Sequence, residues 1–428
     1  MDMYQSVIER IERHKINGVP FSNGQIHPFY NGFSIANLPD SICRWLAIPA
    51  LRDNSLAEEF HQGLNDSFQH VIFVLVDGLS LRVFQRFFDD INSRSGENRW
   101  KSHFQSGHLL PLTSICPSTT STALTSIWTG REPCEHGIIG YELFLKEFGL
   151  IANMITHSVA SFIKSPVNIN GAGFDPSDFL PVKTMGSHCH QHGVDAFTFQ
   201  HNSIAYSGLS RMLFPKVHQL GFKDLSGLWR SVNELLTNQH NKSYMYVYWG
   251  GLDTLSHRAG PDSEELYKEW CRFAELLSFF IESIKKSAPA KSLLILTADH
   301  GQIATEISAD YDLHNHPDLQ RQLVMVPTGE SRLPYLNIKP GRQDEVAEYL
   351  EAHWDGGFSM LPSIDIQASG LLGRQGVHQS TIDRMGSHVV FPLGNAYWWW
   401  VEKENHLLGR HGGLSAEEML VPFFAMPL

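Results

Sequence analysis

Three apolar runs in the sequence each lead to an aspartate. Residues 71–76 precede Asp77, residues 244–249 precede Asp253, and residues 293–298 precede Asp299. Such continuous β-branched and aromatic runs are typical of strands that are buried on both faces of a parallel sheet. The ligand sites of open α/β sheets lie outside the carboxyl ends of the strands. We therefore expect the three carboxylates to gather at one sheet edge, where a bound metal ion would relieve their mutual repulsion.

Three histidines stand beside these aspartates or beside a glycine turn. His257 follows Asp253 by four residues, which places both on one face if the segment is a helix. His300 directly follows Asp299, and His411 precedes two glycines. Any one of the 23 histidines could be an ordinary core or surface residue, so the prediction rests on the whole set. Six such donors suit zinc, or alternatively manganese or iron, and they exceed what one catalytic zinc binds, which favours two metal ions.

A hydroxyl-rich turn offers a nucleophile for such a pair of metal ions. Residues 117–122 read Pro-Ser-Thr-Thr-Ser-Thr and precede a predicted helix that ends at Thr129 and Gly130. The N-terminus of a helix favours an anion such as a phosphoryl group. Serine and threonine are also preferred there simply as N-caps, so the motif alone leaves both interpretations open.

The order of the predicted elements indicates an α/β fold, with a central, mostly parallel sheet flanked by helices. We expect residues 1–66 to form a lead-in that packs on the core. Residues 67–428 would form the catalytic domain, with inserted cap segments at about 142–240 and 302–375. After the second insertion the chain is expected to return to the sheet at residues 395–401.

Composition narrows the class of function. The 428 residues carry a net charge of −12, which argues against a nucleic-acid-binding surface, because phosphate contacts need clustered lysine and arginine. A phosphorylated small molecule remains compatible, since bound metal ions reverse the charge locally. The five cysteines form no CxxC pair, and the sequence shows neither a signal peptide nor a membrane-spanning run. We expect a cytoplasmic enzyme with no membrane partner, and nothing in the sequence specifies an oligomeric state.

Five blocks of the sequence resemble the alkaline phosphatase superfamily, most closely its type I phosphodiesterase/nucleotide pyrophosphatase branch and the related PglZ-type proteins. The blocks occur in the family's order over residues 70–428 and lie at 76–78, 117–139, 253–261, 298–301 and 411–422. The resemblance implies a metal-dependent hydrolase of phosphate esters, of phosphodiesterase or nucleotide pyrophosphatase type. Its substrate would be a small phosphate ester or a nucleotide, and its cofactors two divalent metal ions, zinc or alternatively manganese.

The resemblance also assigns roles to residues. It places the nucleophile at Thr120, with Thr119 and Thr122 as alternatives, and implies a phosphothreonyl intermediate. One metal ion would be held by Asp77, Thr120, Asp299 and His300, and the other by Asp253, His257 and His411.

Two departures from the family pattern bear on the substrate. Gly140 and Tyr141 stand where nucleotide pyrophosphatases carry a phosphoryl-binding asparagine, and no arginine clamp is evident near Thr120, although Arg82 and Arg131 are neighbours in sequence. A phosphomonoesterase or a phosphonate hydrolase on the same scaffold is therefore an alternative. A sulfatase is not, because its C/S-x-P-x-R motif is absent. A catalytically inactive metal-containing binding module is the alternative from another class.

Overall fold

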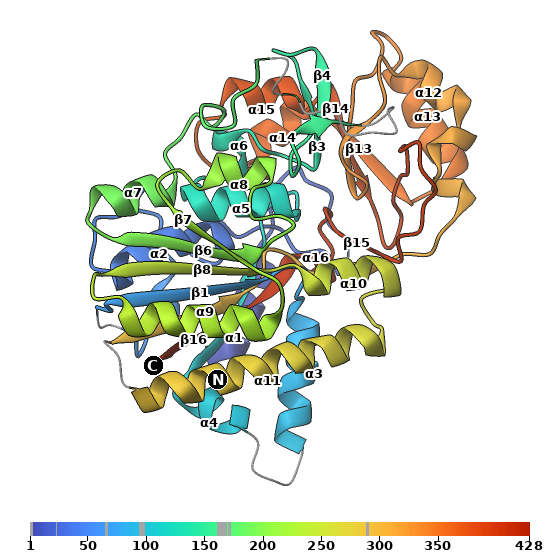
Figure 1. Cartoon of the computed structure of the whole chain (residues 1–428). Helices are drawn as coiled ribbons and strands as arrows, with labels where there is room; N and C mark the ends of the chain where they lie inside the picture. Colours follow the sequence, from blue (N-terminus) through green and yellow to red (C-terminus); the bar gives the residue numbers. More distant parts are fainter. Residues whose placement is uncertain are drawn as a thin grey trace.

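The chain folds into two lobes, each built on a seven-stranded sheet (Figure 1). The computed structural model describes residues 3–22, 24–64, 67–93, 99–160, 169, 173–287 and 291–428. Parts of the expected lead-in (1–2, 23 and 65–66) and of the first expected insertion (161–168 and 170–172) lie outside the described residues.

The larger lobe contains the core sheet, whose strand order is β2-β16-β9-β1-β8-β6-β7. Its strands are β1 (His70–Val76), β2 (His108–Thr113), β6 (Asp195–His201), β7 (His218–Phe222), β8 (Ser243–Trp249), β9 (Ser292–Thr297) and β16 (Leu420–Pro427). Of these seven strands, β16 is antiparallel to the other six, which are parallel to one another. Every residue of β1, β8 and β9 is buried, as their apolar runs predict, so the expected mostly parallel sheet is confirmed.

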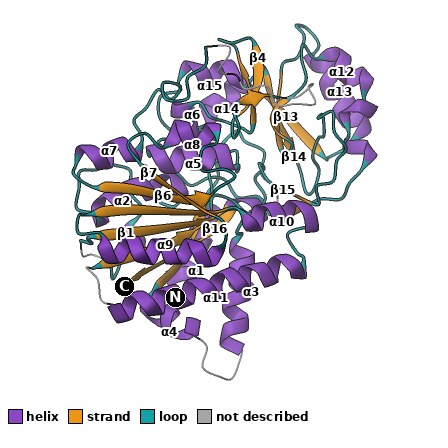
Figure 2. Cartoon of the chain, viewed as in Figure 1, coloured by secondary structure: helices purple, strands orange, loops and turns teal. Residues whose placement is uncertain are grey.

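Helices cover both faces of the core sheet (Figure 2). One face carries α2 (Leu38–Trp45), α5 (Thr120–Thr129), α7 (Met185–Gln191) and α8 (Gly208–Leu213); the other carries α3 (Leu81–Ser93), α9 (Leu225–Asn238), α10 (Gly251–Ala259) and α11 (Glu264–Ser287). Successive side chains of β8 point to opposite faces of the sheet, so the strand packs against both helix layers. Tyr246 contacts Trp128 of α5, with ring centroids 5.2 Å apart, and Trp249 stacks on Phe273 of α11 at 4.3 Å.

The N-terminal segment packs at the β2 edge of this sheet. It contains α1 (Met3–Arg13), and α4 (Arg99–Ser106) lies nearby against β16. Val7 and Ile11 of α1 are buried in the main hydrophobic core, so the N-terminal segment is part of the larger lobe.

The second lobe is an antiparallel sheet with the order β13-β14-β12-β11-β3-β4-β5. Its strands are β3 (Glu142–Leu145), β4 (Leu150–Asn153), β5 (Ser158–Val159), β11 (Thr328–Glu330), β12 (Leu333–Leu336), β13 (Phe358–Pro362) and β14 (His388–Pro392). Its helices are α6 (Pro133–His136), α12 (Pro317–Gln322), α13 (Gln343–His353), α14 (Ser363–Ser369) and α15 (Gln379–Arg384). A two-stranded ribbon, β10 (Ile303–Ala304) with β15 (Gly409–Arg410), and the short α16 (Ala416–Met419) complete the α-helices and strands of the described residues.

Three expectations about the insertions need correction. Residues 142–159 do enter the second sheet, but the rest of the expected insertion at 142–240 supplies β6 and β7 to the core sheet. The sequence hides β7 because it is an edge strand with mostly exposed side chains. The second excursion also continues past residue 375 to include β14. Finally, residues 395–401 form no strand beyond one bridge at Trp399, and Trp398 is buried in a small core of the second lobe.

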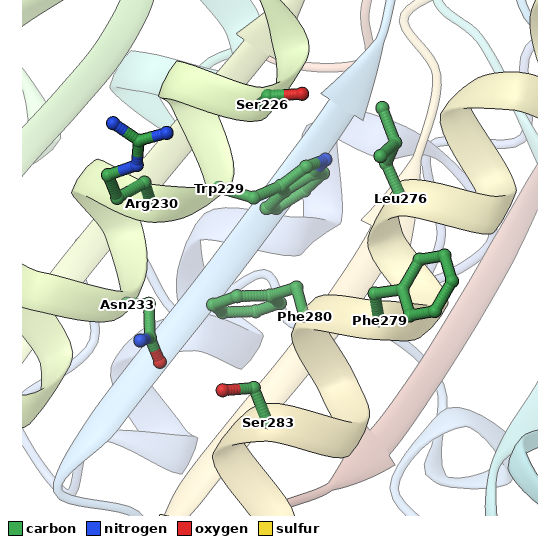
Figure 3. A pocket seen from close by; sticks show the side chains of 8 residues that line it. All are labelled: Ser226, Trp229, Arg230, Asn233, Leu276, Phe279, Phe280 and Ser283. Atoms are coloured by element: carbon green, nitrogen blue, oxygen red, sulfur yellow. The ribbon is translucent and has the colours of Figure 1, made fainter.

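The outer surface of the larger lobe carries a groove of about 420 Å³ between α9 and α11 (Figure 3). Trp229, Arg230, Asn233, Leu276, Phe279, Phe280 and two serines line it, and none of the predicted site residues is among them. No helix in the described ranges combines the length and apolar composition needed to cross a membrane.

Candidate active site

The three strand-end aspartates lie at the same edge of the core sheet. β1 is the central strand of the three, flanked by β9 and β8, and the register pairs Val76 with Trp249 and Leu75 with Thr297. Asp77 follows β1 directly, Asp299 follows β9 after one residue, and the two side chains are 2% and 0% exposed. Asp253 lies in the first turn of α10, which leaves the end of β8 (Figure 1). The predicted gathering of carboxylates is confirmed.

Asp77, Asp299 and His300 form the first group of donors, with one ligand atom of each within 4.8 Å of the others. His300 Nε2 lies 3.5 Å from Asp77 Oδ1 and 3.6 Å from Asp299 Oδ2. The other oxygen of each carboxylate has a partner. Tyr248 donates its hydroxyl hydrogen to Asp77 Oδ2, and the backbone N–H of His300 donates to Asp299 Oδ1 over 3.0 Å.

Two carboxylate oxygens in this group have no hydrogen-bond partner in the described part of the chain, although both are buried. They are Asp77 Oδ1 and Asp299 Oδ2, the same two atoms that face His300. A buried carboxylate oxygen without a partner is costly, and a cation would remove that cost. The donor set therefore fits a metal ion.

Asp253, His300 and His411 form the second group. Asp253 Oδ1 lies 3.8 Å from His411 Nε2 and 3.4 Å from His257 Nε2. The ring of His411 stacks on that of His300, with centroids 3.9 Å apart, and lies 5.2 Å from that of His257. All of the sequence-predicted donors thus converge on one place, and His300 stands between the two groups.

The three histidines present the same ring nitrogen to the carboxylates. Their Nδ1 atoms contact backbone carbonyls, of Gly409 at 2.8 Å for His257, of Gly301 at 3.0 Å for His300, and of Ser118 at 3.2 Å for His411. A carbonyl only accepts, so Nδ1 carries the hydrogen and Nε2 keeps a free electron pair. This tautomer is the one that binds a metal through Nε2.

Thr120 is the first residue of α5, and its hydroxyl reaches the first group. Thr120 Oγ1 lies 3.1 Å from His300 Nε2 and 3.5 Å from Asp77 Oδ2. Thr119 is the N-cap residue, and Thr122 is fully buried. Of the three candidate threonines, Thr120 is the one whose hydroxyl contacts the Asp and His donors in the described part of the chain, and it stands in the first turn of α5, where backbone N–H groups favour an anion.

Burial and mutual repulsion dominate the electrostatics of the metal-free site. Desolvation, together with the neighbouring carboxylates, raises the pKa of Asp77 well above its usual range. Desolvation and the charge of Asp253 raise the pKa of Asp299 to about 7. Desolvation and the adjacent imidazoles hold the pKa of His411 well below 6.5, which keeps that ring neutral.

The structure also identifies supporting residues that the sequence did not indicate. Tyr248 holds Asp77, and Gln302 donates from Nε2 to Asp253 Oδ1 over 2.6 Å. Tyr248 is hidden inside the apolar run of β8, but Gln302 could have been suspected because it follows the Asp299-His300-Gly301 block directly.

The two departures from the family pattern have structural counterparts. Arg82 pairs with Asp262 at the surface, and Arg131 pairs with Glu135, so both guanidinium groups are engaged away from Thr120. Tyr141 is 42% exposed and hydrogen-bonds to the side chain of Asn153.

A mostly parallel α/β sheet with Asp and His donors at its carboxyl edge, beside a threonine at a helix N-terminus, matches a hydrolase of the alkaline phosphatase superfamily and includes a candidate metal site. The sequence profile of the type I phosphodiesterase/nucleotide pyrophosphatase family matches residues 71–412, and the chain belongs to this family of phosphoester hydrolases. Enzymes of this family use divalent metal ions.

Solved structures with the same fold include two kinds of enzyme. Murine ectonucleotide pyrophosphatase/phosphodiesterase 5 superposes with a TM-score of 0.59 and 18% identity, over 83% of this chain and 87% of that chain. Phosphonoacetate hydrolase from Sinorhizobium meliloti, bound to phosphonoformate, superposes with a TM-score of 0.58 and 17% identity, over 83% of this chain and 89% of that chain. The murine enzyme is also known as an inactive threonine-to-alanine variant in complex with AMP. No curated protein sequence matches the chain.

The turn at Gly78 should be required for the spacing of the aspartates. Its φ is +74°, and an added Cβ would meet Asp253 Cα at 3.0 Å. We expect Gly78→Ala to weaken metal binding by at least about tenfold, because it forces Asp77 and Asp253 apart. Gly193→Ala is the matched control, since Gly193 has φ +69° with nothing within 4 Å of an added Cβ. Equal metal affinity of the two variants would contradict the expectation.

Removal of a carboxylate should stabilise the metal-free protein at high pH. The folded-state pKa of Asp299 is raised to about 7, so ionising this carboxyl lowers the free energy of unfolding. This loss of stability grows as pH rises from about 4 to 7 and stays at its full size above pH 7. We expect metal-free Asp299→Asn to be more stable than wild type by about 1–3 kcal/mol at pH 8, and the difference to shrink at pH 5. Urea unfolding in the presence of a chelator measures both values. Added zinc should stabilise the wild type more at pH 8 than at pH 5.

Proposed function

We propose that the chain hydrolyses phosphodiester or phosphoanhydride bonds of small, nucleotide-like substrates, with Thr120 as nucleophile and two divalent metal ions. Zinc is the expected metal and manganese the alternative. The position of the Thr120 hydroxyl carries the proposal, because it joins a helix N-terminus to the donors Asp77 and His300. Asp77, Thr120, Asp299 and His300 would hold one ion, and Asp253, His257 and His411 the other.

The residues of the chain account for the steps of the reaction. The first-turn N–H groups of α5 would bind the phosphoryl oxygens and align the phosphorus with Thr120. Thr120 Oγ1, after losing its proton, attacks phosphorus in line, and the ester oxygen leaves to give a phosphothreonyl enzyme. Water then attacks phosphorus from the vacated side and restores the threonine. Bound metal ions would lower the pKa of the hydroxyl and neutralise charge on the reacting oxygens.

The surroundings of Thr120 favour a diester over a monoester. A monoester carries an extra negative charge that an arginine near the nucleophile could neutralise, and both neighbouring arginines are paired elsewhere. Tyr141 could donate to a phosphoryl oxygen in place of the family's asparagine. The fold shared with phosphonoacetate hydrolase keeps a phosphonate substrate as the second candidate. A binding module without catalysis has less support, because the complete donor set converges on a hydroxyl. A cytoplasmic location stays a prediction from the sequence.

Loss of the Thr120 hydroxyl should abolish turnover without emptying the metal sites. We expect Thr120→Ala to lower kcat by at least about 10³-fold, because no other hydroxyl occupies its position. Metal content, measured by elemental analysis, should stay near that of the wild type. Thr122→Ala is the control, since its hydroxyl lies buried in the same helix and has no hydrogen-bond partner in the ranges that the structure describes. Full activity of Thr120→Ala would refute the assignment.

A substrate panel separates the candidate functions. With zinc or manganese, kcat/KM should be highest for bis-p-nitrophenyl phosphate or a nucleotide diester. It should be lower by about tenfold or more for p-nitrophenyl phosphate, since Arg82 and Arg131 are paired elsewhere and do not compensate the extra charge. A preference for phosphonoacetate would favour the second candidate. Two bound metal ions without hydrolysis of any ester would favour the binding module.

A further inference from the structure

A buried arginine from the second lobe reaches the loop that carries His411. Arg332 lies in the turn between β11 and β12 and is only 2% exposed. Its Nε donates to Glu418 Oε1 over 3.1 Å and its Nη2 to Glu418 Oε2 over 2.8 Å, while Nη1 donates to the carbonyls of Gly394 and Ala396. Glu418 is fully buried, so this forked pair is desolvated at both ends.

Glu418 in turn holds the backbone that follows His411. Its Oε1 accepts from the N–H of Gly413 at 2.9 Å, and its Oε2 accepts from that of Ser415 at 3.2 Å. Gly413 is two residues from His411, so the carboxylate fixes the loop beside the imidazole. A short chain of hydrogen bonds thus connects Arg332 to a donor of the second metal group.

The same loop is also tied to the strand-to-helix turn that carries Thr120. Ser118 accepts from the N–H of Gly412 through Oγ at 3.2 Å, donates from Oγ to the carbonyl of Gly413 at 2.7 Å, and offers its own carbonyl to His411 Nδ1. The loop is therefore held from the Thr120 side by Ser118 and from the second lobe by Glu418.

A second residue of the same hairpin supports the Thr120 side. Desolvation raises the pKa of Glu330 to about 8, while the adjacent Thr119 side chain and Tyr141 backbone lower it. An added Cβ at Gly412 would meet Glu330 Cβ at 2.7 Å, so the loop passes directly against this side chain. The hairpin thus contacts both the turn that precedes Thr120 and the loop that follows His411.

We propose that Arg332 is a positioning residue, which acts through Glu418 to hold His411 beside Asp253 and His257, where it would bind the second metal ion. The proposal rests on the proposed two-metal function. A buried ion pair is often no more stabilising than apolar residues of similar size. Glu418 does more than pair, because its oxygens also fix two N–H groups of the loop, and apolar residues could not do so.

The test compares two conservative substitutions at arginine–glutamate pairs. Arg332→Lys keeps the charge but loses the planar fork. Arg374→Lys is the control, because Arg374 also pairs with a buried glutamate. Its Nε and Nη2 both donate to Glu132 Oε1, and it also contacts Asn31 and Tyr30, not the His411 loop. Zinc and manganese stoichiometry and affinity are measured by competition with a chromophoric chelator, beside the melting temperature and kcat/KM.

We expect Arg332→Lys to bind one metal equivalent about 10–100-fold more weakly than wild type while the other equivalent is retained. Arg374→Lys should bind both equivalents normally, even if its melting temperature falls. Two normal equivalents in Arg332→Lys would overturn the proposal and leave the pair as a purely structural one. If Arg332→Lys does not fold, Glu418→Gln replaces it, because the amide oxygen can still accept from Gly413 while the ion pair is lost. Weaker binding of one equivalent supports the proposal, and unchanged binding overturns it.

The same measurements keep this proposal apart from the proposed function. A wild-type protein that binds fewer than two metal equivalents would contradict the two-metal site itself. A wild-type protein that binds two and hydrolyses a diester, with Arg332→Lys unaffected, would contradict only the role of Arg332.

Discussion

The repulsion among buried carboxylates is the constraint on which the site depends. Asp77 and Asp299 follow adjacent strands at the sheet edge, and each keeps a buried oxygen that has no hydrogen-bond partner among the described residues. Their raised pKa values express the free-energy cost of ionising them in a metal-free protein. A fold retains such a cluster against its own stability only where function requires it. Three histidines, whose Nδ1 atoms contact backbone carbonyls, turn Nε2 toward the carboxylates of the site and complete the donor set.

The parts of the fold that are local in sequence were predictable. The runs that end at Asp77, Asp253 and Asp299 are apolar throughout, since their strands are buried on both faces, and they point to the sheet edge without further information. The four-residue spacing of Asp253 and His257 places both on one face if the segment is helical, and α10 supplies that helix. In these segments the local pattern and the tertiary environment agree, which is why sequence reasoning succeeded.

The parts that depend on distant contacts were not predictable. β7 is an exposed edge strand, so it lacks the apolar run that reveals β1, and its segment was taken for an insertion. Trp398 and its neighbours suggested a strand, yet their burial comes from packing in the second lobe. Arg332 and Glu418 are 86 residues apart, and neither position carries a local signal. Charged residues are buried only when paired, but the sequence does not show which residue is the partner.

The two lobes contribute differently to the proposed chemistry. Core-sheet strand ends supply Asp77 and Asp299, whose positions follow from strand register and leave little freedom. The second lobe approaches from the other side through Tyr141 and the β11–β12 hairpin, where Gly140 and Gly329 come so close that an added Cβ at Gly140 would meet Gly329 Cα at 2.7 Å. Loops on a rigid scaffold can change without disturbing the core. Differences in substrate between this chain and other proteins of the same fold should therefore arise in the second lobe, while the donors at the sheet edge stay the same.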